Sequence, residues 1–143
     1  REMKELIAAD SNICRNYKLL TSIKGVGPIT AIVMLCSTLN FTKITDHRKF
    51  ACYCGLAPFE HSSGTSVRGG CHTSSMANRD IKVQLNRSAL IAIRCDPQLK
   101  AYYERKVAEG KHKFSVLNAV RAKIAARCFA VVRRGTPYVA LQI

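Results

Sequence analysis

The sequence has no apolar run as long as the roughly 18 residues that a membrane-spanning helix needs, although 48% of its 143 residues are hydrophobic. It also shows no signal peptide at its start. Its length and apolar content are typical of one domain with a core of its own. Because Arg1 already stands within a stretch of helical character, we expect the chain to be a fragment of a longer protein.

Acidic residues are scarce: 9 Asp and Glu stand against 23 Lys and Arg, a formal net charge of +14. A domain this basic usually binds a polyanion, because neutralising phosphates releases their condensed counterions. The alternative is a basic protein without such a partner. The acids are spread along the chain, with no close pair outside residues 1–17, so a self-contained two-metal site is not expected.

Seven cysteines, an odd number without a secretion signal, indicate free thiols and a reducing compartment, the cytoplasm. A zinc site could be drawn from four candidate ligands, Cys52, Cys54, Cys71 and His72. Their spacing is C-x-C followed by an adjacent pair, which is not that of structural zinc sites. We predict no metal site in this chain.

Residues 1–17 have apolar side chains near helical spacing among charges, which predicts the end of an upstream, coiled-coil-like helix. Residues 18–143 then form the domain proper. Further helices are expected over residues 29–39, 47–53, 97–110 and 115–134, and from Ser74 or Ser75 to about Arg94. Asp46 is a plausible N-cap and Gly135 a plausible stop signal. No segment has the pattern of a strand, so the predicted class is all-α.

The last of these helices has the clearest periodicity. Its core seam is predicted to contain Leu117, Val120, Ile124, Cys128 and Val131, at steps of 3, 4, 4 and 3 residues. A basic line on another face contains Lys123, Arg127 and Arg134.

The stretch from Ile23 to Ala31 reads apolar-x-Gly-apolar-Gly-x-x-x-Ala, a pattern that resembles the helix-hairpin-helix DNA-binding motif. Its glycines permit unusual backbone angles and close approach, and Pro28 suits a first helical turn. Such a turn leaves backbone N–H groups outward, where a phosphate oxygen can bind without base contacts. The predicted DNA-binding residues here are Lys24, Gly25, Val26 and Gly27. The alternative is a purely structural hairpin.

Residues 55–71, GLAPFEHSSGTSVRGGC, have no helical period, and loops of this length are usually functional or disordered. Ser62 and Ser63 stand beside His61, with small residues around them. We predict that this loop presents a serine nucleophile to a nucleic-acid phosphate. The alternative is that its hydroxyls only bond the loop backbone.

Taken in order, these pieces resemble the C-terminal transposase domain of the insertion sequence 110 family, which is related to Piv-type invertases and bridge-RNA-guided recombinases. The resemblance covers residues 18–139. Its landmarks are IKGVGP at 23–28, FACYCGLAP at 50–58, SSG at 62–64, Asn78 with Ile81-Lys82, NAVRAK at 118–123 and GTPY at 135–138. One departure is Ser75-Met76-Ala77-Asn78, where the family commonly has Lys-x-Gly-Asn.

The resemblance implies a serine that attacks a DNA phosphate and becomes covalently linked to it. It implies no cofactor in this fragment; Mg²⁺ would be held by four acids of an N-terminal domain with the RNase H fold. The implied partners are DNA, a guide RNA and further copies of the whole protein, without a membrane. The family's Ser-Gly pair maps to Ser63, with Ser62 as the fallback.

Four cations are the candidates for holding the phosphate: Arg68, Arg79, Lys82 and Arg121. Arg79 and Lys82 share a polar stripe with Asn86, for which a solvated helix face is the alternative. For Arg121 a merely solvated position is the alternative. The leading hypothesis is therefore a transposase domain that binds DNA and supplies the nucleophile. The runner-up is a non-catalytic helix-hairpin-helix module, and a third is a helical scaffold whose charge binds RNA.

Overall fold

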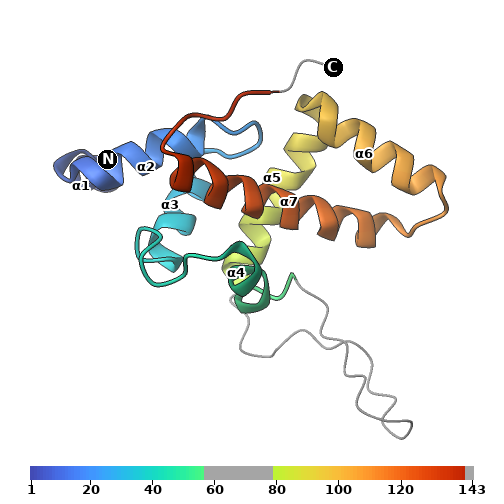
Figure 1. Ribbon diagram of the computed structural model, residues 1–143, viewed down its shortest axis with the longest axis horizontal. Helices are drawn as coiled ribbons and strands as arrows, with labels where there is room; N and C mark the ends of the chain where they lie inside the picture. Colours follow the sequence, from blue (N-terminus) through green and yellow to red (C-terminus); the bar gives the residue numbers. More distant parts are fainter. Residues whose placement is uncertain (57–78, 141–143) are drawn as a thin grey trace, which may run out of the picture.

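The computed structural model describes residues 1–56 and 79–140, and within them the chain is all-α, as expected (Figure 1). The helices are α1 (Glu2–Ala9), α2 (Ser11–Thr21), α3 (Pro28–Ser37), α4 (His47–Tyr53), α5 (Arg79–Cys95), α6 (Pro97–Ala108) and α7 (Lys113–Arg134). The predicted start of α5 near Ser74 lies outside the described residues. Helices α2 to α7 supply buried side chains to one core, to which α7 contributes the most, whereas α1 has no buried residue.

Aspartates begin three of these helices. Asp46 accepts from the N–H of Arg48 at 3.0 Å and opens α4, as the sequence predicted. Asp10 accepts from the N–H groups of Asn12 and Ile13 at 2.9 and 3.1 Å. An N-cap has an extended backbone, so Asp10 ends α1 and starts α2. The single helix expected over residues 1–17 is therefore wrong.

Proline and glycine set other boundaries. Pro28 stands in the first turn of α3, where its missing N–H costs nothing. Gly135 caps α7 in the left-handed conformation, with φ of 70°. Between α3 and α4 three consecutive non-glycine residues, Leu39, Asn40 and Phe41, also have positive φ. The Asn16 side chain donates to that of Asn40 at 2.7 Å and ties this bend to α2.

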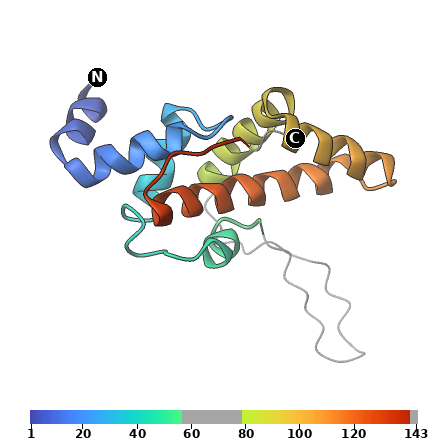
Figure 2. The same cartoon turned by 45° about the horizontal axis from the view of Figure 1, so that its top comes forward.

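The predicted seam of α7 is confirmed, because all five of its residues are buried. Helix α5 crosses α7, and α6 returns along α7 on one side (Figures 1 and 2). Helix α4 packs on α7 from another side and buries Phe50 completely against Phe129. After Gly135 the C-terminal segment turns back beside the α2–α3 hairpin, where the N–H of Tyr138 donates to Ser22 Oγ at 2.9 Å.

No helix among the described residues is long and apolar enough to cross a membrane.

Candidate nucleic-acid interface

The hairpin connection between α2 and α3 packs tightly against α5. Gly25 has φ of +95°, and a Cβ placed on it would lie 2.7 Å from the carbonyl oxygen of Ser88. The Thr30 and Ser88 hydroxyls share a buried hydrogen bond of 2.9 Å across the same contact. Gly25 is thus required by the packing of the hairpin on α5, a role that its motif position did not reveal.

The other side of the turn is open. Lys24 is exposed, and a Cβ placed on Gly27 would meet nothing within 4 Å. Val26 is buried. Within the hairpin, Lys24 has a side chain that a ligand could reach and Gly27 leaves room for close approach to its backbone, in front of the first turn of α3. The DNA contact itself stays a prediction.

The chain enters the serine-bearing loop at a fixed point. After α4, Cys54, Gly55 and Leu56 are all buried. Lys82 Nζ donates to the Gly55 carbonyl at 3.4 Å, and Asn118 Nδ2 donates to the Leu56 carbonyl at 2.8 Å. One donor comes from α5 and the other from α7, so two helices hold consecutive carbonyls just before residue 57. We call Gly55, Leu56, Lys82 and Asn118 the loop root.

Several predicted site residues lie outside the described residues: Ser62, Ser63 and Arg68, together with Cys71 and His72 of the unfavoured zinc set. The predictions for them stay predictions. Of the two remaining cysteines in that set, Cys52 is exposed, whereas burial raises the pKa of Cys54 to about 11. The described residues contain no group of three or more His, Cys, Asp or Glu side chains that could hold a metal ion.

Arg79 is exposed at the start of α5, free to meet solvent or a ligand. Arg121 is not solvated in that way: it donates to the Asn86 Oδ1 at 2.6 Å, and its Nε is buried without a hydrogen-bond partner. Desolvation lowers the pKa of its guanidinium. Lys82 donates to a carbonyl of the loop root. Lys82 and Arg121 are therefore both bonded to acceptors within the protein.

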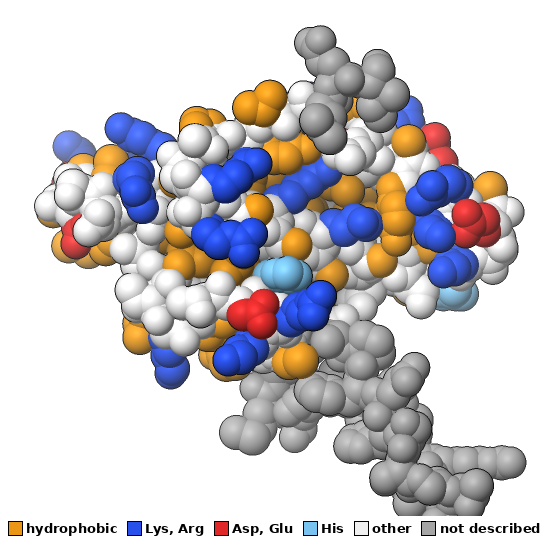
Figure 3. Space-filling model, viewed as in Figure 1, with side chains coloured by type: hydrophobic (Ala, Val, Ile, Leu, Met, Phe, Trp, Pro, Cys, Tyr) orange, Lys and Arg blue, Asp and Glu red, His pale blue; other side chains and the backbone are white. Residues whose placement is uncertain are grey.

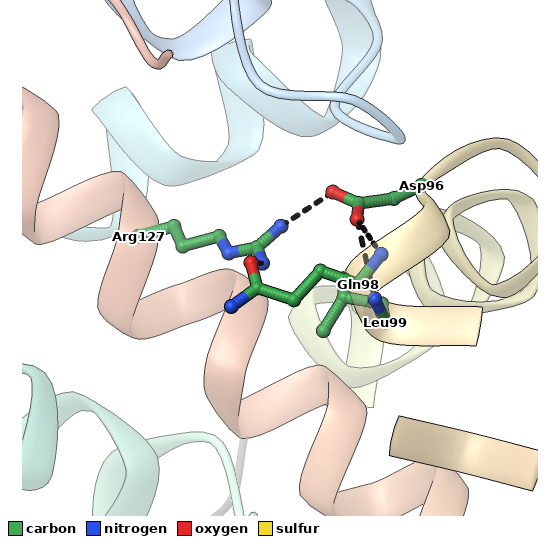
Figure 4. A network of polar contacts seen from close by, with 4 residues as sticks. All are labelled: Asp96, Gln98, Leu99 and Arg127. Carbon is green, nitrogen blue, oxygen red and sulfur yellow. Dashed lines mark hydrogen bonds and ion pairs between the residues drawn. The ribbon is translucent and has the colours of Figure 1, made fainter. Parts of the chain in front are cut away.

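The three cations of the basic line on α7 also differ in whether they have a partner within the protein. Arg127 reaches the Asp96 carboxylate at 2.7 Å and Gln98 Oε1 at 2.8 Å, as Figure 4 shows. Burial works against the charge of Asp96, but the bond from Arg127 and those from the N–H groups of Leu99 and Gln98 hold its pKa below the usual value. Lys123 and Arg134 stay exposed.

Sequence reasoning missed Asn86 as the acceptor for Arg121, Asp96 as an ion-pair partner, and Asn118 as a donor to the loop root. Asp96 could have been found, because an acid at an N-cap can also face a basic line on a neighbouring helix. No sequence signal pairs Asn118 with Leu56, which is 62 residues away.

Comparison with known proteins adds a family. The model of the family described as "Transposase IS116/IS110/IS902 family" matches residues 17–104. That range holds the hairpin, the serine-bearing loop and α5, in the order in which the sequence suggested the resemblance.

Curated relatives of the chain are consistent with this family match. The chain is 39% identical over 121 residues to the "Insertion element IS110 uncharacterized 43.6 kDa protein" of Streptomyces coelicolor, covering 84% of the chain and 29% of that protein. It is 24% identical to the "Pilin gene-inverting protein" of Moraxella bovis, over 94% of the chain and 42% of that protein. It is 30% identical to the "Insertion element IS900 uncharacterized 42 kDa protein" of Mycobacterium paratuberculosis, over 77% of the chain and 28% of that protein. The chain thus spans less than half the length of these relatives.

Proposed function

The chain belongs to the IS116/IS110/IS902 transposase family, and from this membership we propose that it binds DNA and supplies a serine nucleophile for strand cleavage and joining in transposition. The observation that carries the proposal is the family match over residues 17–104, which includes the hairpin, both candidate serines and α5. The net charge of +14 supports a phosphate-rich partner.

The proposed reaction is a phosphoryl transfer. Ser63 Oγ attacks the phosphorus of a DNA phosphodiester, an Oγ–P bond forms, and the bond from phosphorus to one sugar oxygen breaks. The serine proton passes to a base, and the leaving sugar oxygen takes up a proton. The oxygen of a sugar hydroxyl on a second strand then attacks the phosphorus and gives its proton to a base. A new O–P bond joins the strands as the Oγ–P bond breaks, and the released serine oxygen takes up a proton. A serine hydroxyl needs such proton removal because it is weakly nucleophilic on its own.

Positioning and charge neutralisation dominate phosphoryl transfer. The loop root supports positioning, since Lys82 and Asn118 hold the carbonyls of the first two residues of the predicted loop, Gly55 and Leu56. Arg79 begins the helix that follows the loop and is exposed, so it is the described cation best placed to meet a phosphate there. Lys82 and Arg121 are proposed to act mainly through the scaffold.

The family resemblance implies Mg²⁺, but the described part of this chain does not fit a metal ion: no three candidate ligands gather there. No step above is therefore assigned to a metal held by these residues. In the proposal the metal ligands belong to an N-terminal domain, and DNA, a guide RNA and further protein copies are the partners.

The test uses the longest natural protein that contains this sequence. Ser63→Ala should abolish strand cleavage and the covalent protein–DNA adduct while DNA binding persists. Ser66→Ala, a nearby serine of the same loop, is the matched control and should cleave normally. An adduct that survives in Ser63→Ala and disappears in Ser62→Ala would move the nucleophile to the fallback position. An adduct that survives in both variants would refute the proposal.

A non-catalytic helix-hairpin-helix module is the second candidate, favoured by the open face at Gly27 and the exposed Lys24. Under it, every loop serine is dispensable and the hairpin alone controls binding. Gly27→Ala is the suitable variant, because its backbone has φ of −89° and its Cβ would meet no protein atom. Gly25→Ala would disturb the packing on α5 and confuse the two effects.

A further inference from the structure

A groove with a cavity volume of about 440 Å³ runs between α6, α7 and the C-terminal segment. It lies apart from the loop root, which faces α4 and the beginning of α5. Its walls consist of Gln98, Leu99, Tyr102, Lys123, Ala126, Arg127, Arg134, Tyr138 and Val139. Three of these residues are cations and none is acidic, so the lining carries an excess of positive charge.

The cations of the groove differ in what they can offer. Arg127 is committed to the buried carboxylate of Asp96. Lys123 and Arg134 are exposed, and within the described chain no carboxylate lies within 4 Å of either. On the face drawn in Figure 3, Lys and Arg side chains are spread among apolar ones and acidic side chains are few. Two positive charges are therefore left for an anion from outside.

A tyrosine ring holds one of these two free cations, Lys123, and a second ring lies beside the paired Arg127. Lys123 Nζ lies 4.6 Å from the ring centre of Tyr102, and Arg127 Cζ lies 4.8 Å from that of Tyr138. Cation–π contacts of this kind restrict the cation without neutralising it. A preordered cation loses less entropy when it binds a phosphate than a freely moving one.

The C-terminal segment connects the groove with the hairpin. Tyr138 lines the groove with its side chain, and its backbone N–H donates to Ser22 Oγ at the end of α2. Lys24 and the open backbone at Gly27 follow within five residues of Ser22. The C-terminal segment runs back from the end of α7 beside the α2–α3 hairpin (Figures 1 and 2).

We propose that this groove binds the sugar-phosphate backbone of a DNA duplex, extending past Tyr138 the contact made at the hairpin. The inference rests on the proposed DNA binding, but not on the serine chemistry. A duplex is the occupant that this connection with the hairpin favours, since a hairpin of this kind contacts backbone phosphates without reading bases.

The experiment compares two charge-matched double variants of the full chain. Lys123→Gln with Arg134→Gln removes the two free cations of the groove. Lys113→Gln with Arg133→Gln removes an exposed Lys and an exposed Arg of the same helix that do not line it. Affinity for a labelled duplex is measured by fluorescence anisotropy across a salt series, with single-stranded RNA of the same length in parallel.

The groove variant should bind the duplex on the order of tenfold more weakly at moderate salt, and its log-affinity against log-salt slope should fall by about 2, since two phosphate contacts are lost. The control should change far less. Equal losses in both variants, or a loss confined to RNA, would overturn the inference.

Lysine acetylation of the unaltered chain provides a readout that needs no variant. Bound duplex should protect Lys123 from acetylation and leave Lys113 reactive. Equal acetylation of the two lysines in the presence of duplex would contradict binding in the groove. If the unaltered chain binds no DNA, the proposed function and the inference fail together. Normal binding with an unaffected groove variant removes the inference alone.

Discussion

The two halves of α7 each carry an arginine that reaches across to another helix, and the two contacts are built differently. Arg127, in the C-terminal half, meets the carboxylate of Asp96, which is itself bonded to two N–H groups. Arg121, in the N-terminal half, meets the neutral amide of Asn86 and leaves its Nε buried without a partner.

A buried ion pair stabilises a fold only when its remaining hydrogen bonds are also satisfied. The carboxylate of Asp96 fulfils that condition, and its partners Arg127, Gln98 and Leu99 line the proposed duplex groove. The Arg121 contact does not fulfil it and lies in the half of α7 that also provides Asn118 to the loop root. The two ends of α7 thus differ: the contact at Asp96 combines an ion pair with hydrogen bonds, and the contact at Arg121 leaves a buried donor unsatisfied.

The largest effect is expected for Asp96→Ala. It removes the N-cap of α6 and leaves Arg127 without its carboxylate, which should cost about 3 kcal/mol of unfolding free energy. Asp46→Ala, which removes a cap without a buried ion pair, should cost about 1 kcal/mol. Urea denaturation measures both values, and equal losses would show that the ion pair between Asp96 and Arg127 adds nothing.

The same ion pair should govern part of the pH dependence. Because the pKa of Asp96 is lowered in the folded state, its contribution is present above the unfolded pKa and is lost as pH falls through the folded pKa. The stability of Asp96→Asn should therefore fall less between about pH 5 and pH 2 than that of the unaltered chain. Thermal melts across that range test this, and parallel curves would contradict it.

A smaller loss is expected at the loop root. Asn118→Ala removes one hydrogen bond to the buried Leu56 carbonyl and should cost about 1 kcal/mol. If Asn118 positions the loop, strand cleavage in the longest natural protein should fall well beyond the fraction unfolded, while duplex affinity stays normal. Asn118→Asp can no longer donate and should behave like Asn118→Ala; normal cleavage by either variant would make the contact merely structural.

The smallest change is expected for Arg121→Met. The substitution removes an unsatisfied buried donor together with one hydrogen bond, so the unfolding free energy should change by less than about 1 kcal/mol. Arg127→Met, which strands Asp96, is the matched comparison and should cost several times more. A large loss of unfolding free energy for Arg121→Met would show that the two arginine contacts do not differ. A loss of duplex affinity with unchanged stability would instead support the predicted phosphate contact of Arg121.

Local patterns predicted much of this molecule. Four predictions that depend only on neighbouring residues were confirmed: the periodic seam of α7, the N-cap at Asp46, the helix start at Pro28 and the helix end at Gly135. The error at Asp10 has the same origin: its side chain caps α2, but the apolar spacing on both sides made one helix look continuous.

Amino-acid order alone therefore determined the all-α class, most helix boundaries, the excess of positive charge and the order of motifs that marks the family. Only the tertiary structure decided which cations remain available. Arg127, Lys82 and Arg121 are occupied by partners 27 to 35 residues away, and Gly25 is occupied by packing on α5. A sequence states that a residue is charged or small, but whether it faces a ligand depends on which distant side chain or carbonyl the fold places beside it.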